Sequence, residues 1–309
     1  MISVIGENVI DLLSQTDGSF RASVGGSPLN VAVGVARAQV PSYYLSPLSL
    51  DAMGQRITQQ LQGDGVQLPD NNRSHCPTSL AFVTFDAAGQ PQYSLYRQGI
   101  ADRDTSAERL LAALPKATKI LHTGSLALEP QDAEQLIPVL KAAKAWGMWL
   151  SIDINVRLAF VSDAADYRRY LLELIPLADI IKASDEDLEH LFGAGDGLDK
   201  LKALNPHALI AYTTGASGAR LYLKDCEVFA PAVAAEPFVD TVGAGDTFFA
   251  NLLAGLVTWH GQPLPPVNDL LPLLQRANLA ASLNVRKAGC QPPHKNELDA
   301  AFAAVYGPT

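Results

Sequence analysis

The sequence contains few cysteines and no block of basic residues. Its three cysteines, Cys76, Cys226 and Cys290, are too far apart for a closely spaced metal knuckle, and an odd number argues against a disulfide framework. Lys and Arg number 23 against 32 Asp and Glu, a net charge of −9. An acidic chain of this kind is a poor partner for nucleic acid or anionic lipid.

Long apolar runs and several familiar motifs are absent as well. The most apolar stretch, residues 248–259, is shorter than the ~20 residues that a membrane-spanning helix needs. No basic start followed by an apolar run precedes residues 2–9, so we expect no signal peptide and a soluble, cytoplasmic protein. The chain has no GxxxxGK[ST] motif and no HExxH pair, which excludes a P-loop protein and a zincin.

What is present is an alternation of strand and helix patterns over 309 residues, enough for one large domain or two smaller ones. This alternation predicts an α/β fold with a central, mostly parallel sheet flanked by helices. Predicted strands cover 2–9, 118–123, 148–153, 179–182, 208–213 and 219–223. Predicted helices cover 132–146, 166–175, 185–192, 197–204, 244–259, 268–285 and 296–306.

Two segments interrupt the alternation. Residues 12–25 contain Asp17-Gly18 between extended pieces, a hairpin signal, and the strands 78–86 and 92–97 flank a turn at 87–90. With no helix between them, these strands should pair antiparallel. We interpret them as a small β lid over a crevice, with an edge extension of the main sheet as the alternative. The predicted body is 1–11, 26–76 and 105–309, and the predicted lid is 12–25 and 77–104.

The segment 240–248, DTVGAGDTF, carries the strongest chemical signal. Gly243 and Gly245 lie where a loop enters a long apolar helix, and the first amides of a helix are unpaired and partly positive. Glycines let a phosphate oxygen approach these amides, which predicts an anion hole. Asp246, in the first turn, is then placed to accept a proton from an attacking hydroxyl. An ordinary helix start, with an aspartate favoured by the dipole, is the alternative.

The same four letters, GAGD, occur again at 193–196. There the glycines follow a predicted helix, so Gly193 suits a helix C-cap. No long apolar helix begins after Asp196, so we interpret this copy as a connector.

A second segment, GGSPLNVA at 25–32, predicts another helix start. Ser27 suits the N-cap and Pro28 the first helical position. The amide of Asn30 then points from the first turn beside a bare Gly-Gly backbone, an arrangement that suits a polyhydroxyl ligand. An ordinary capped helix is the alternative.

Two stretches, GGSPLNVAVGVARAQ at 25–39 and DTVGAGDTFFANLLAGL at 240–256, resemble the paired signatures of the ribokinase-like carbohydrate kinases, the PfkB family. The likeness extends from residue 2 to about 293, and residues 76–102 look most like bacterial fructokinases. The resemblance implies a ribokinase-like fold, ATP and Mg²⁺ as cofactors, Asp246 as the catalytic base, and Gly243, Ala244 and Gly245 as the anion hole.

The resemblance also implies a sugar-binding side and a nucleotide-binding side. Asp11 has independent support, because it ends the first predicted strand, where α/β crevices bind ligands. Sugar-binding positions implied are Asp11, Gly25, Gly26, Asn30, Arg97 and Asn155. Nucleotide-side positions implied are Arg157, Lys182, Ser184, Thr213, Gly215, Gly218 and Asn278.

The metal position departs from the family pattern. The family has an N-x-x-E motif that supports magnesium through water, and here Ser184 replaces the Asn and Asp187 replaces the Glu. Asp187 is the implied water-mediated ligand, and a merely charged first helical turn is the alternative. By resemblance, a K⁺ site would lie near Asp240 and Gly289.

These observations predict an ATP-dependent kinase for the primary hydroxyl of a small sugar, with fructose first. A 2-keto-3-deoxygluconate kinase or a ribokinase-type activity is the alternative within the family. A catalytically silent sugar-sensing protein is the alternative of another class. Exposed lid strands often pair between subunits, so we also expect a homodimer through the lid.

Overall fold

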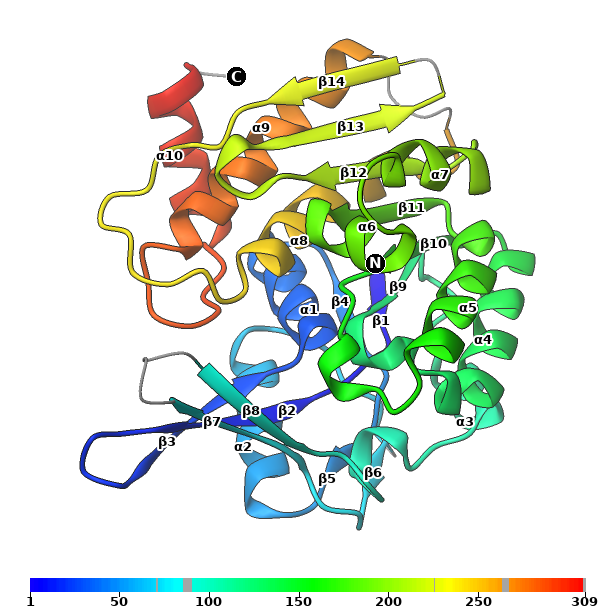
Figure 1. The fold of residues 1–309 in the computed structure, drawn as a ribbon, viewed down its shortest axis with the longest axis vertical. Helices are drawn as coiled ribbons and strands as arrows, with labels where there is room; N and C mark the ends of the chain where they lie inside the picture. Colours follow the sequence, from blue (N-terminus) through cyan, green and yellow to red (C-terminus); the bar gives the residue numbers. More distant parts are fainter. Residues whose placement is uncertain (71, 86–90, 225, 263–266, 308–309) are drawn as a thin grey trace.

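The computed structural model describes residues 1–70, 72–85, 91–224, 226–262 and 267–307, which form an α/β body beside a smaller sheet (Figure 1). The turn predicted at 87–90 lies outside the described residues. Within the described ranges, no helix has both the length and the apolar character needed to cross a bilayer.

The body is built on an eight-stranded sheet in the order β14-β13-β12-β11-β10-β9-β1-β4. The pairings from β12 to β4 are parallel, whereas β13 and β14 add an antiparallel edge. The predicted mostly parallel sheet is therefore confirmed. Its strands are β1 Ile2–Val4, β4 Ser42–Tyr44, β9 Ile120–Gly124, β10 Trp149–Asp153, β11 Ile180–Ser184, β12 Leu209–Thr213, β13 Ala219–Leu223 and β14 Cys226–Ala230.

Helices cover both faces of this sheet (Figure 1). Neighbouring strand residues enter opposite cores, since side chains alternate along a strand: Ile180 lies in one cluster and Ile181 in the other. One cluster includes α1 Ser27–Arg37, α2 Ala52–Gly63, α8 Ala244–Leu256 and α9 Val267–Asn284. The other includes α3 Ala107–Ala113, α4 Ala133–Ala145, α5 Ala164–Leu174, α6 Asp185–Phe192 and α7 Gly197–Leu204, and α10 Lys295–Tyr306 packs on α9.

The small sheet has the order β3-β2-β7-β8. Its strands are β2 Val9–Ser14, β3 Phe20–Gly25, β7 Ser79–Phe85 and β8 Pro91–Tyr96, and a separate pair joins β5 Leu48–Ser49 to β6 Arg73–Ser74. Both hairpins pair antiparallel, as predicted. The central pairing, β2 with β7, is parallel, because the chain returns to the body between them and both strands leave it in the same direction.

The predicted strand at 2–9 is wrong in one respect: it is two strands in different sheets, β1 and β2. The residues between them turn against Tyr44, whose hydroxyl donates to the Gly6 carbonyl at 2.7 Å and accepts from Asn8 Nδ2 at 3.1 Å. Asp11 therefore does not end the first strand of the body. It lies within β2, and the small sheet carries it.

The helices α1 and α8 pack closely although their sequences are some two hundred residues apart. Gly34 makes this possible, because a Cβ on it would lie only 2.6 Å from the Cβ of Ala250. The first turns of α1 and α8, which hold the two signature segments, are thereby brought together.

Candidate active site

The start of α8 offers backbone amides to an anion. Gly243 is the N-cap, with φ 72°, and a Cβ there would lie 2.2 Å from Cys290 Sγ, so only glycine fits. The amides of Gly243, Gly245 and Asp246 have no acceptor among the described residues, whereas the Ala244 amide donates to Thr241 O at 3.1 Å. Three unpaired amides therefore lie at the positive end of a helix, which is an arrangement that can hold a phosphoryl oxygen.

The Asp246 carboxylate is buried at the same corner, and each of its oxygens accepts a hydrogen bond from α1. Ser27 Oγ donates to Oδ1 at 2.7 Å, and Asn30 Nδ2 donates to Oδ2 at 2.8 Å. The predicted N-cap role of Ser27 is wrong: the N-cap is Gly26, and no side chain caps the helix. The distant carboxylate takes the hydroxyl that would otherwise cap α1.

Asn155 joins this cluster from the loop after β10. Its Nδ2 donates to Ser27 Oγ at 3.0 Å. Its backbone has φ 37°, in the left-handed region that asparagine tolerates better than most residues. The structure thus brings Asn155, Ser27, Asn30 and Asp246 together from three separate segments.

A buried ion pair lies behind the amides. Lys182 Nζ is 2.9 Å from both carboxylate oxygens of Asp153, and the two side chains are 6% and 0% exposed. A Cβ on Gly245 would be 3.4 Å from Lys182 Nζ, so the ammonium lies against the start of α8. Burial alone would lower the pKa of Lys182, but the carboxylates of Asp153 and Asp187 raise it. Lys182 therefore lies against the start of α8 as one half of a buried ion pair with Asp153.

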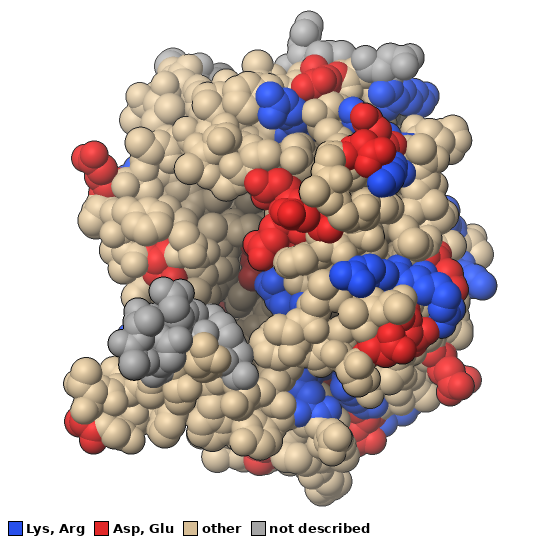
Figure 2. Space-filling view, in the orientation of Figure 1, with Lys and Arg blue, Asp and Glu red and all other residues tan. Residues whose placement is uncertain are grey.

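Asp11 and Gly25 lie against each other where the small sheet meets the body. The position of a Cβ on Gly25 is 2.4 Å from Asp11 Oδ2. The Asp11 carboxylate has no hydrogen-bond donor among the described residues, and burial raises its pKa to about 6. A partly buried carboxylate without donors can accept ligand hydroxyls. Figure 2 shows the surface hollowed between the small sheet and the body, with carboxylates at the rim.

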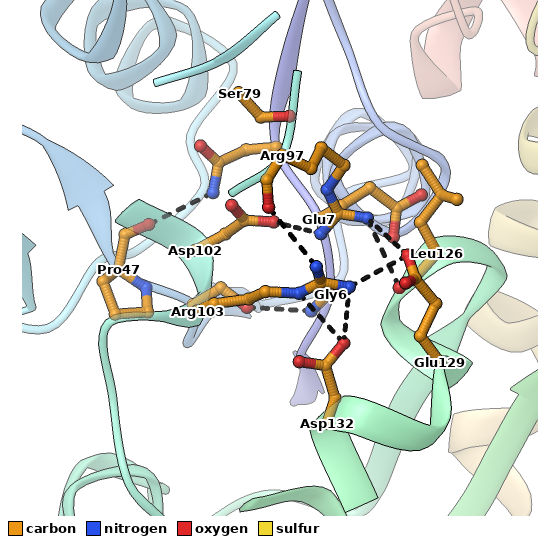
Figure 3. A network of polar contacts seen from close by, with 12 residues as sticks. Gly6, Glu7, Pro47, Ser79, Arg97, Asp102, Arg103, Leu126, Glu129 and Asp132 are labelled. Atoms are coloured by element: carbon orange, nitrogen blue, oxygen red, sulfur yellow. Dashed lines mark hydrogen bonds and ion pairs between the residues drawn. The ribbon is translucent and has the colours of Figure 1, made fainter. Parts of the chain in front are cut away.

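Arg97 is not an exposed strand residue. It follows β8 and is buried in an ion network with Arg103, in which Arg97 Nη2 contacts Asp102 at 2.7 Å (Figure 3). Arg103 contacts Glu129 at 2.9 Å and Asp132 at 3.0 Å. Both guanidinium groups are therefore already paired with carboxylates. A substrate contact by Arg97 stays a prediction.

A fourth carboxyl group, that of Glu7, faces the same network. Burial raises the pKa of Glu7 to about 7, against the opposing effect of Arg97. Glu7 Oε1 accepts the Ser27 amide at 3.1 Å, which anchors the first turn of α1. Glu7 and Asp102 line a cavity of about 30 Å³, room for one water molecule.

The loop after β10 is fastened to α6 through Asp187. Its Oδ1 accepts the Val156 amide at 2.7 Å and its Oδ2 accepts the Ser184 amide at 2.8 Å, while Ser184 Oγ accepts the Asp187 amide, completing a capping box. Both oxygens of Asp187 thus serve backbone amides. No group of three or more potential metal-ligating side chains occurs among the described residues. Arg157 lies in this loop and donates to the Val156 carbonyl at 3.2 Å.

The remaining nucleotide-side positions lie at the far end of the sheet. Thr213 ends β12, and Gly215 and Gly218 lie in the loop before β13 with φ 53° and 108°. Asn278 on α9 donates to the carbonyls of Ala230 and Pro231 at 2.9 and 3.0 Å. Its side chain therefore ties α9 to the end of β14.

At the predicted K⁺ position, both oxygens of the Asp240 carboxylate accept hydrogen bonds from backbone amides. Asp240 accepts the Val242 amide at 2.9 Å through Oδ1 and the Gly289 amide at 2.9 Å through Oδ2. These bonds join the segment before α8 to the loop that carries Cys290.

Sequence reasoning missed the roles of Ser27, Glu7 and Asp153 in this site. Ser27 was visible only as a helix start, and its partner lies 219 residues away. Glu7 stands in an apolar run, ISVIGENVI, where a lone carboxylate is itself a signal of a functional or paired position.

Comparisons with known proteins give the family of the chain and the structures that it resembles. A family model described as pfkB family carbohydrate kinase matches residues 1–297. A fructokinase from Rhizobium leguminosarum bv. trifolii is 33% identical over 83% of this chain and 79% of its own length. The structure of an uncharacterized sugar kinase from Pyrococcus horikoshii in complex with ATP has a TM-score of 0.81 at 30% identity and covers 96% of each chain. A double-mutant fructokinase from Vibrio cholerae O395, in a fructose-, ADP- and potassium-bound form, has a TM-score of 0.81 at 25% identity and covers 98% of this chain and 97% of its own.

Proposed function

We propose that this chain, which belongs to the pfkB family of carbohydrate kinases, uses fructose as its sugar. Family membership makes it an ATP-dependent phosphotransferase acting on a sugar. The choice of fructose is the proposal, and relatives named fructokinase support it.

One observation favours a neutral sugar over a sugar acid. A carboxylate-bearing substrate such as 2-keto-3-deoxygluconate needs a cation near the small sheet. Arg97 and Arg103, which follow β8, are candidates for that cation. Both are engaged with carboxylates, at 2.7 Å from Arg97 to Asp102 and 2.9 Å from Arg103 to Glu129. Freeing either would leave a buried carboxylate unpaired, which costs several kcal/mol, about 3–5 for a broken buried pair.

In the proposed mechanism, the sugar lies between the small sheet and the start of α8. Asp11 accepts sugar hydroxyls, with Gly25, Gly26, Asn30 and Asn155 as further sugar-side residues. Arg97 is proposed on the sugar side by resemblance alone, because its guanidinium is already paired with Asp102. Asp246 takes the proton of the primary hydroxyl as its oxygen attacks the γ-phosphorus, and the bond from that phosphorus to the ADP oxygen breaks. The free amides of Gly243, Gly245 and Asp246, with the Lys182 ammonium behind them, stabilise the negative charge that develops on the transferring group. The Ala244 amide, also implied by the resemblance, is already bonded to the Thr241 carbonyl.

The nucleotide would lie on the C-terminal half, near Arg157, Ser184, Thr213, Gly215, Gly218 and Asn278. Magnesium, when bound, would neutralise phosphate charge. With both Asp187 oxygens holding amides, this chain offers the ion at most a water-mediated contact there, and ATP phosphates and water would supply most ligands, as Mg²⁺ commonly prefers. A K⁺ ion near Asp240 and Gly289 is proposed on the same resemblance.

The predicted lid, residues 12–25 and 77–104, which contains most of the small sheet, is proposed to close over the site and to form a dimer surface. Its outer strand β3 exposes Phe20, which is 44% accessible and packs edge-on against Phe82. Analytical ultracentrifugation of the parent against a Phe20→Ser variant tests the dimer. A parent that sediments as a monomer would contradict it.

The test of the function is a coupled ADP-release assay over fructose, ribose, 2-keto-3-deoxygluconate and nucleosides, with and without K⁺. We expect fructose to give the highest kcat/KM. A higher kcat/KM with the sugar acid would overturn the fructose assignment but would still be consistent with a kinase. No turnover with any sugar would favour the silent sugar-sensing reading.

A further inference from the structure

We propose that Ser27 is a positioning residue for the catalytic base: its hydroxyl holds the carboxylate of Asp246 in the orientation from which it meets the sugar hydroxyl. This inference rests on the proposed role of Asp246.

The direction of the hydrogen bond is set by the neighbours of Ser27. Asn155 Nδ2 donates to Ser27 Oγ at 3.0 Å, and an amide nitrogen cannot accept a proton in return. The hydroxyl proton must therefore point to another acceptor. Asp246 Oδ1, at 2.7 Å, is that acceptor, and a bond to an ionised oxygen is stronger than a neutral one.

The position of Ser27 itself is held on two sides. Its backbone amide donates to Glu7 Oε1 at 3.1 Å, so the residue is anchored before its side chain makes any contact. Ser27 is 8% exposed and Asp246 is 9% exposed. In such a buried place, water competes poorly for the serine hydroxyl.

Each oxygen of Asp246 has a separate restraint, and this is what fixes the carboxylate plane. Asn30 Nδ2 holds Oδ2 at 2.8 Å, while Ser27 holds Oδ1. If Asn30 were the only donor, the Asp246 carboxylate could still rotate while it keeps its hydrogen bond to Asn30. Each oxygen keeps a second lone pair, so a sugar hydroxyl can be bound without displacing either donor.

The experiment compares Ser27→Ala, Ser27→Thr and Ser27→Cys with the parent on whichever sugar the panel shows to be turned over. We expect kcat of Ser27→Ala to fall about 10- to 100-fold, the rate equivalent of one hydrogen bond to a charged group. KM for the sugar should stay near the parent value. Ser27→Thr, which keeps the hydroxyl, should recover most of kcat, whereas Ser27→Cys, with a weak donor, should not.

The pH profile separates positioning from mere packing. Losing a donor to the ionised base should move the acid limb of kcat to higher pH in Ser27→Ala and Ser27→Cys. An unmoved limb, or equal kcat in all four proteins, would overturn the proposal. Thermal unfolding of each variant identifies any protein that has simply lost its fold, and Ser27→Cys, which keeps the shape, replaces Ser27→Ala in that case.

A double-mutant cycle tests the link to Asn155. Asn155→Gly removes the amide without straining a backbone at φ 37°. If Asn155 acts on the base through Ser27, the effect of Asn155→Gly on kcat should shrink in the Ser27→Ala background. Strictly additive effects would refute this relay.

A crystal structure of Ser27→Ala gives a readout that needs no activity. We expect the Asp246 carboxylate to leave its present plane. A carboxylate that stays in place would overturn the proposal, whatever the panel shows about the sugar. Conversely, a moved carboxylate in a protein that phosphorylates no sugar would support the positioning and contradict the proposed function.

Discussion

Replacing Asp246 with asparagine removes the proposed base while changing the shape of the side chain very little. The carboxylate now accepts one donor on each oxygen, from Ser27 at 2.7 Å and Asn30 at 2.8 Å. The asparagine amide has one oxygen and one NH₂ group, so its NH₂ group would lie against one of those two donors without accepting a hydrogen bond. The amide also cannot take a proton from the sugar hydroxyl. Loss of a general base typically lowers the rate by roughly 10²–10⁴-fold, or about 3–5.5 kcal/mol in the barrier.

The assay is coupled ADP release at saturating sugar, with sugar affinity measured separately by calorimetry. We expect kcat of Asp246→Asn to fall within that range while sugar binding persists. The chain supplies its own control, because Asp196 ends the second GAGD segment but is an exposed residue that pairs with Lys200. Asp196→Asn should leave kcat unchanged. Parent-like turnover by Asp246→Asn would remove Asp246 from the catalytic role and, with it, the proposed mechanism.

Two further predictions concern stability. Burial raises the pKa of Glu7 from 4.5 to about 7, so the folded chain binds this proton more tightly, and stability is lost as pH rises from 4.5 to 7. Glu7→Gln removes that loss. In denaturant titrations, the free energy of unfolding of Glu7→Gln minus that of the parent should therefore rise by up to ~3 kcal/mol between pH 4.5 and 7. A difference that does not change with pH would contradict this prediction. Gly243→Ala adds a Cβ 2.2 Å from Cys290 Sγ, whereas at Gly147, where φ is also positive, the space is open. Thermal unfolding should therefore show a larger loss for Gly243→Ala than for Gly147→Ala, whose cost is about 1 kcal/mol of backbone strain, and equal losses would rule out the clash.

Much of the body could be predicted because its signals are local. The strands β9 to β12 are short runs with Ile and Leu among their residues, and they alternate with amphipathic helices. Each run fills cores on both faces of a parallel sheet. The hairpin at 12–25 was likewise carried by Asp17-Gly18. By contrast, the short strand β4 and the break between β1 and β2 have no local signal, because contacts with Tyr44 decide where the first run ends.

The site divides in the same way. The start of α8 was predictable because glycines, a helix start and an acidic first turn all lie within one short segment. The burial of Arg97 could not be predicted, because it depends on the distant carboxylates of Asp102, Glu129 and Asp132. Without knowledge of those partners, an arginine at the end of a strand is expected to be solvated.

Ser27 shows why local reasoning gives the wrong role even when it identifies the right segment. A serine before a proline at a helix start is the ordinary pattern of an N-cap. Capping competes with any stronger acceptor that the fold brings near, and an ionised, buried carboxylate is stronger than a neutral arrangement at the helix end. Close packing of α1 on α8 through Gly34 supplies that carboxylate. Tertiary packing thus places Ser27 in the site although its local sequence is typical of a helix cap. Where an N-cap pattern lies next to a glycine pair, a distant acidic partner should therefore be sought before the residue is assigned a capping role.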